Sequence, residues 1–260
     1  MSSSGAGLLA SEFPPSVEEF FPPALFGLDG WLTKFTIFAW VAVGVLIVFF
    51  LAASRNPKIV PTRLQWMGES IYGFARDGIA VPNLGHEGVK FAPYFATLFS
   101  FILLTNLFSI VPFFQISPNA HIAFPILLAV ISYVIFNYVG IRKHGLVKYV
   151  KTAVVPNAPW YILPLLIPIE FFSTFIVRPV TLSVRLFANM FAGHMILLVF
   201  TLGGFALLGA NAWYIQSISV LSWLLAIVLT FLEALVILLQ AYVFVVLTSS
   251  YIQGALAEEH

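Results

Sequence analysis

Residues 163–201 read LPLLIPIEFFSTFIVRPVTLSVRLFANMFAGHMILLVFT, and a second long apolar run follows at residues 215–251. A helix of about 39 residues is about 58 Å long, whereas the hydrocarbon core of a bilayer is about 30 Å thick. An uninterrupted helix of this length must therefore tilt, by about 60° from the membrane normal, or protrude. With a hinge expected at Gly203, Gly204 and residues 209–213, the two runs predict a long, steeply tilted hairpin of membrane helices.

The composition of the whole chain agrees with a membrane protein. Of the 260 residues, 60% are hydrophobic and 9% are charged, whereas a soluble domain is about half apolar and a quarter charged. A soluble globule of this size cannot bury so much apolar surface, which excludes a soluble enzyme, a nucleic-acid binder and a disordered chain. The chain has no cysteine, so disulfides and thiolate metal sites are excluded as well.

Three shorter apolar runs precede the hairpin, and each is long enough to cross a bilayer once. Between the first two, residues 62–81 place apolar side chains on one side and charges elsewhere, which is typical of a helix on the membrane surface. We therefore expect an all-α membrane protein with five transmembrane helices and one amphipathic surface helix, forming a single membrane domain over residues 31–260. The expected spans are residues 31–53, 91–114, 122–141, 163–201 and 215–251, preceded by an external N-terminal segment at residues 1–30.

The basic residues predict the orientation. Five of them follow the first span and four follow the third, out of 12 Lys and Arg in the chain. The positive-inside rule places these loops in the cytoplasm, the N-terminus outside and the C-terminus inside. The nine residues are Arg55, Lys58, Arg63, Arg76, Lys90, Arg142, Lys143, Lys148 and Lys151.

Several polar residues interrupt the two long runs. Charges at membrane depth cost several kcal/mol and usually mark a pathway or a partner. At 100° per residue, Arg178, Arg185 and Asn189 lie within about 40° of one another, whereas His194 lies about 180° from Arg185. Small residues, Ala188 and Ala192, flank the arginine stripe and permit another helix to approach closely. In the last run the corresponding stripe comprises Ser219, Ser222, Ala226, Glu233 and Gln240.

The chemistry of these groups favours proton movement. Arg185 stays protonated at any working pH, so it can hold an anion and repel cations but cannot carry a proton. Carboxylate and imidazole groups can carry protons. Counted from a turn near residue 208, His194 and Glu233 differ in depth by about 16 Å. They can therefore meet only if the helices are staggered or the last span begins late.

Three motifs resemble subunit a of F-type ATP synthases, of a bacterial type, over residues 31–260. They are RPVTLSVRLFANMFAGH at residues 178–194, LQAYVFVVLTSSYIQGALAEEH at residues 239–260, and TNLFSIVPFF at residues 105–114. The resemblance implies a non-catalytic stator subunit of the plasma membrane that offers two half-channels to a rotating ring of c subunits. It also implies b-type stalk subunits, a soluble catalytic head and membrane lipid as partners, and no cofactor, metal or nucleic acid.

The resemblance assigns roles to individual residues. Arg185 matches the arginine that faces the ring carboxylates. Asn189 and Gln240 match polar residues near that arginine. His194 and Glu233 match the pair that lines the external half-channel. Glu170 and Ser173 match residues of the cytoplasmic exit. Asn106, in the third motif, is the remaining residue expected to take part in proton translocation.

Two departures from the family pattern stand out. His194 and Glu233 are exchanged relative to many bacterial members, as in mitochondrial ones. Glu170 stands nine residues before Pro179 where eight are expected, which a local bulge would accommodate.

Two other functions compete with this hypothesis. A stand-alone secondary transporter or ion channel would usually show internal repeats and broken midplane helices, and this sequence shows neither. An intramembrane enzyme would need a catalytic motif such as HExxH, which is absent. For single residues a structural role stays open: Asn106, Asn189 and Gln240 can join helices, and Arg178 can be an interfacial charge. The loop and terminal histidines, His121, His144 and His260, are expected to be solvated.

Overall fold

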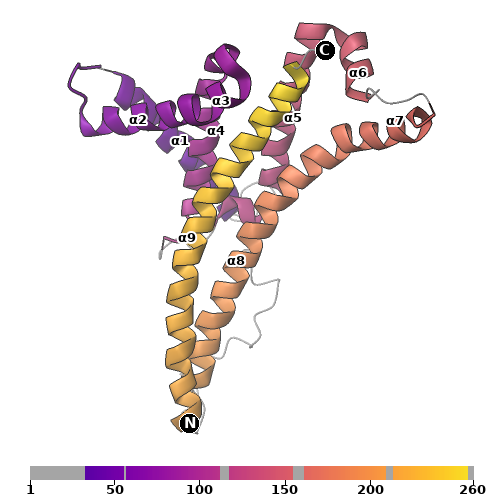
Figure 1. Ribbon diagram of the computed structural model, residues 1–260. Helices are drawn as coiled ribbons and strands as arrows, with labels where there is room; N and C mark the ends of the chain where they lie inside the picture. Colours follow the sequence, from indigo (N-terminus) through magenta and orange to yellow (C-terminus); the bar gives the residue numbers. More distant parts are fainter. Residues whose placement is uncertain (1–32, 56, 112–116, 155–160, 209–212, 257–260) are drawn as a thin grey trace.

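The computed structural model describes residues 33–55, 57–111, 117–154, 161–208 and 213–256 (Figure 1). These residues form helices joined by short turns, and the described ranges contain no strand. The prediction of an all-α protein is therefore confirmed. The N-terminal segment at residues 1–30 lies outside the described residues.

The first helices form a span and a surface platform. Helix α1, Lys34–Ser54, is capped by Thr33, whose hydroxyl accepts from the Thr36 amide. The predicted surface helix is longer than expected and irregular, because it changes from α to π geometry and back. It comprises α2 (Arg63–Gly73), η3 (Phe74–Ala80), α3 (Val81–Leu84) and η4 (Gly85–Lys90).

The platform leads into the second predicted span, α4, Ala92–Leu107, through a bend of 118°. Helix α4 ends seven residues before the predicted boundary at residue 114, because the Ser109 and Ile110 amides bond to the carbonyl oxygens three residues earlier and close tight turns there. By length and composition, four helices can cross a membrane, or five if the bent pair of the platform and α4 counts as one span.

Helix α5, Ala123–His144, is the third span. It ends at Gly145, whose φ of 80° is a left-handed backbone conformation that glycine adopts without strain. A helix that the sequence did not predict follows, α6 (Leu146–Val154). The turn η5, Pro118–Ala120, precedes α5.

The last two segments form the predicted hairpin. The first consists of α7 (Leu163–Phe172), the π-helix η6 (Ser173–Val177) and α8 (Arg178–Leu208), and the second is α9 (Trp213–Leu256). A π turn holds about one more residue than an α turn, so η6 supplies a bulge between Glu170 and Pro179.

The predicted hinge is wrong at Gly203 and Gly204, since both lie inside α8. They serve packing instead. A Cβ atom at position 204 would overlap the indole ring of Trp223 in α9, so glycine here lets α9 approach α8. The rest of the predicted hinge, residues 209–212, lies outside the described part of the chain, which resumes with α9 at Trp213.

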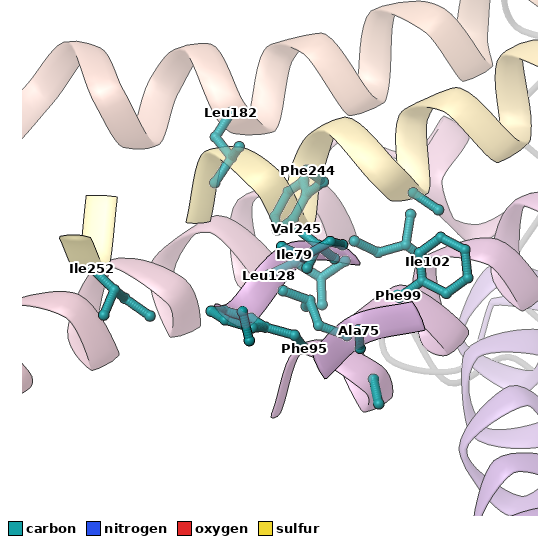
Figure 2. Close-up of a cluster of buried hydrophobic side chains, with 14 of the residues drawn as sticks. Ala75, Ile79, Phe95, Phe99, Ile102, Leu128, Leu182, Phe244, Val245 and Ile252 are labelled. Carbon is teal, nitrogen blue, oxygen red and sulfur yellow. The ribbon is translucent and has the colours of Figure 1, made fainter. Parts of the chain in front are cut away.

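A buried apolar core joins α9 to α4, α5, α8 and the surface platform (Figure 2). Phe95, Phe99 and Ile102 of α4 pack against Phe244 and Val245 of α9 in this core. The end of α1, the platform, α6 and the C-terminal end of α9 lie at one end of the molecule, and the C-terminal end of α8 and the N-terminal end of α9 lie at the other (Figure 1). Both predicted basic loops therefore lie at the same end.

Candidate functional site

Arg185 is the eighth residue of α8 and lies midway along the continuous segment Leu163–Leu208, on a face that other described residues leave uncovered. Arg185, Ala188 and Ala192 are exposed, whereas Leu186 and Met190 are 1% exposed. Among the described residues the Arg185 guanidinium has no hydrogen bond and no ion pair. Sequence spacing predicted this stripe of one cation among small side chains, and the helix presents it outward.

The polar stripe of α9 faces inward, toward the rest of the fold. Ser219, Ser222, Glu233 and Gln240 are all buried. The Ser222 hydroxyl donates to the Phe200 carbonyl oxygen of α8 at 2.7 Å. The two stripes therefore do not share a face: the arginine lies on the outside of the hairpin and the carboxylate inside.

Glu233 is 4% exposed, and neither of its carboxylate oxygens has a hydrogen-bond partner in the described structure. It lies against Gly193, where an added Cβ would be 3.7 Å from the Glu233 carboxyl carbon. Glu233 thus reaches α8 one residue from His194, although sequence spacing alone placed the two residues at different depths. His194 is itself partly buried.

A buried group of polar side chains at the end of α4 adjoins this region. Asn106 and Asn119 are both 0% exposed, and Asn119 Nδ2 donates to Asn106 Oδ1 at 2.6 Å. Asn106 Nδ2 and Asn119 Oδ1 have no partner among the described residues. The Ser109 side chain faces Glu233, but its hydroxyl donates to the Asn106 carbonyl oxygen at 2.8 Å.

Sequence reasoning identified Asn106 but missed Asn119. Both residues belong to one buried pair, because η5 folds back against α4 and α8. The signal available was the dipeptide Pro118–Asn119 beside an apolar run, which looked like an ordinary solvated turn. Only the tertiary fold brings it inside.

A second polar region lies toward the opposite end of α8. A cavity of about 150 Å³ is lined there by Glu170 of α7, Thr174 of η6 and Arg178 of α8, together with side chains of α5, α6 and α9. Arg178 lies over the Tyr251 ring at 5.4 Å. Thr174 lines the cavity, whereas the predicted Ser173 is a partly buried neighbour.

The depths along α8 separate these regions. Position 193, which Glu233 contacts, lies eight residues from Arg185 toward the hairpin turn, and Arg178 lies seven residues away in the other direction. At 1.5 Å per residue these separations are about 12 and about 10 Å. Asn189 is partly buried between Arg185 and Gly193, and Gln240 is buried on α9.

No group of three or more His, Asp or Glu side chains gathers closely enough in the described ranges to hold a metal ion. The geometry places ionisable side chains on both sides of an outward-facing Arg185 along the hairpin, with Glu233 toward one end and Glu170 toward the other. Fold and site together define a multi-pass helical membrane protein of the ion-translocating class.

Comparison with known proteins gives the family. Residues 36–253 match the family model described as ATP synthase A chain. The chain is 48% identical to the ATP synthase subunit a of Nocardioides sp., over 85% of this chain and 80% of the relative. It is 44% identical to that of Rhodococcus erythropolis, over 97% and 94%, and 41% identical to that of Parafrankia sp., over 98% and 88%.

The chain therefore belongs to the ATP synthase A chain family. Membership makes it a multi-pass membrane protein of the ATP synthase membrane sector, with a part in proton transport and ATP synthesis. The alternative of a stand-alone transporter or channel is not favoured.

Proposed function

We propose that this chain is the non-catalytic stator subunit that moves protons past a rotating ring of c subunits, with Arg185 as the fixed charge at the contact. One observation carries the proposal: a mid-helix arginine on a face that the described chain leaves uncovered. A guanidinium at membrane depth is costly unless a partner or water meets it. A ring of carboxylates would be a partner of opposite charge, and Ala188 and Ala192 would let its helices approach.

Two half-channels on either side of Arg185 follow from the polar groups. We assign access from outside to Glu233, His194 and Asn106, on the side of the hairpin turn. Access from the cytoplasm is assigned to Glu170 and Ser173. The separations along the continuous α7–η6–α8 segment support this division. His194 lies nine residues from Arg185 toward the C-terminal end of α8, about 14 Å at 1.5 Å per residue, and Glu170 lies fifteen residues away in the other direction, about 22 Å.

Arg185 separates the two paths by its permanent charge. A ring carboxylate must lose its proton to one half-channel before it passes the guanidinium, and it gains another from the opposite half-channel afterwards. Because the guanidinium cannot be deprotonated, protons cannot jump directly across it. Asn189 lies one turn from Arg185 on α8, and Gln240 lies on the facing helix α9. We assign both residues to keep the surroundings of the Arg185 guanidinium polar.

The orientation and the other partners belong to the same proposal. The loops with nine basic residues face the cytoplasm of a bacterial cell, with the N-terminus outside and the C-terminus inside. The b-type stalk subunits bind this chain directly, and the soluble catalytic head couples to it indirectly. The chain itself needs no cofactor.

Cross-linking tests the contact. A cysteine at Ala188, in a chain without natural cysteines, is coupled to a short photoreactive maleimide in the whole complex. We expect an adduct with the ring subunit. Val48→Cys on α1, a position 67% exposed, is the matched control and should give none. If the complex assembles but no adduct formed at position 188 contains the ring subunit, the proposal is contradicted.

A further inference from the structure

The cavity near Glu170 is lined by titratable side chains from five neighbouring helices. Its volume of about 150 Å³ has room for several water molecules, each of which occupies about 30 Å³ in the liquid. Polar walls of this kind favour water over an empty space. The titratable residues are His144 (α5), Tyr149 (α6), Glu170 (α7), Arg178 (α8) and Tyr251 (α9).

His144 differs from the solvated loop residue that the sequence predicted. It is the last residue of α5, and its side chain is partly buried. Its Nε2 atom is buried and has no hydrogen-bond partner in the described structure. Because buried polar atoms are nearly always satisfied by protein or water, an imidazole nitrogen on the cavity wall is a natural partner for cavity water.

The other lining groups are poorly suited to exchange protons at neutral pH. Burial raises the pKa of the Tyr149 hydroxyl, an effect that the Arg178 charge partly offsets. Tyr149 therefore stays protonated, and its hydroxyl donates to Asn137 Oδ1 at 3.1 Å. Arg178 keeps its charge throughout. The Tyr251 ring packs against the Arg178 guanidinium at 5.4 Å. Glu170 and His144 are the carboxyl and imidazole groups of the lining, the side-chain types that most often transfer protons, and they come from different helices.

The charges around His144 permit a transient cation there. The carbonyl end of α5 favours a positive side chain in the last turn, and Glu170 lies on the same cavity. Arg178 opposes the charge from α8. On α5 itself, Arg142 is exposed and Lys143 donates to the Leu256 carbonyl oxygen at 3.0 Å, so neither competes for the cavity.

We propose that His144 is the proton-exchange residue between this cavity and the cytoplasm. During ATP-driven pumping, the neutral imidazole takes a proton from a cytoplasmic hydronium ion, which becomes water, and the imidazolium passes the Nε2 proton through cavity water to the Glu170 carboxylate. The imidazole returns to its neutral form, and no electrons move. In ATP synthesis the same steps run in reverse. This inference rests on the proposed function, since it extends the cytoplasmic path assigned to Glu170.

The test uses the whole ATP synthase in vesicles with the catalytic head facing out. His144→Ala and His144→Gln remove the imidazole from the cavity wall, and His86→Ala removes an exposed histidine of η4 as the matched control. We expect the His144 variants to pump about tenfold more slowly at alkaline external pH. This loss is smaller than the usual loss on removing a positioned proton carrier, because water still provides a slower route into the cavity. The defect should shrink toward acid pH, where bulk water delivers more protons.

Added imidazole separates proton exchange from folding. It should restore His144→Ala at alkaline pH and leave His86→Ala unchanged. Wild-type pumping by both His144 variants at alkaline pH overturns the inference, and so does a slow, fully assembled His144→Ala complex that imidazole does not restore. An Arg185→Ala complex in the same vesicles reports on the proposed function separately. If the Arg185→Ala complex pumps, the proposed function fails. If the Arg185→Ala complex does not pump but the His144→Ala complex pumps normally, only the role of His144 is overturned.

Discussion

Glu233 is buried against Gly193 with neither carboxylate oxygen hydrogen-bonded within the described chain. This position gives the residue access to the His194 region but not to the exposed face that carries Arg185. A change at Glu233 should therefore affect proton delivery without disturbing the ring contact. The prediction is specific to the carboxylate, because glutamine keeps nearly the same shape.

Glu233→Gln should lower ATP-driven vesicle acidification by about tenfold or more, in keeping with the loss of a positioned proton carrier. The amount of assembled complex should not change. Glu87→Gln, on the exposed surface of η4, is the charge-matched control and should behave as wild type.

Exchanging the pair tests whether the two groups form one relay. His194→Glu combined with Glu233→His should recover more acidification than either single change. The recovery should be partial, because the neighbouring packing suits the present arrangement. A double variant no better than the worse single would show that the two residues are not coupled.

At the residue scale, sequence reasoning found the groups whose chemistry is costly in an apolar run. Arg185 and Glu233 were visible because a charge within a long hydrophobic stretch needs a reason. Asn119 and His144 were missed because each lies at a turn or helix end, where a polar residue is usually solvated. Asn119 is buried because η5 packs against α4 and α8, and His144 is partly covered where α6 and α9 meet its cavity; no local pattern indicates either arrangement.

Gly204 sets how closely the helices of the hairpin approach. A Cβ atom at this position would overlap the Trp223 indole, and that ring also packs edge-on against Phe205 at 5.3 Å between centroids. The indole cannot move without losing this contact. Gly204→Ala should therefore destabilise the hairpin by about 1–3 kcal/mol, the usual cost of overpacking.

Thermal aggregation of the purified complex measures this effect. Gly204→Ala should lower the midpoint, while Gly44→Ala on α1, with no atom within 4 Å of the added Cβ, should not. A Gly204→Ala complex as stable as the Gly44→Ala complex would mean that the indole repacks without cost.

At the element scale, length was the reliable signal. Runs of 20 residues or more became helices because the bilayer fixes their minimum length. The nine-residue α6 was missed because it is too short to produce a strong periodic pattern. The only sequence signal for the π-helix η6 was one extra residue between Glu170 and Pro179. No local pattern indicated the π segment of the platform.

The whole molecule places its basic loops at one end and its hairpin turn at the other (Figure 1). Charge counts predicted that the two basic loops share one side of the membrane. They could not predict how the other helices pack around α9.

Single-cysteine labelling tests the orientation. Arg142→Cys at the end of α5 and Ile122→Cys just before it are both exposed positions. A membrane-impermeant maleimide should label Arg142→Cys from the cytoplasmic side and Ile122→Cys from outside. The reverse pattern in intact cells would place the basic loops outside and contradict the assigned half-channels.

The central claim is that Arg185 is the fixed charge that divides the two proton paths. Its most direct test is proton movement in vesicles that carry only Arg185→Ala or Arg185→Lys complexes, with Arg55→Ala, an exposed arginine after α1, as control. We predict that both Arg185 variants abolish ATP-driven acidification and that Arg185→Ala adds a passive proton leak, while Arg55→Ala pumps normally. Sustained ATP-driven acidification by fully assembled Arg185→Ala complexes would contradict the account.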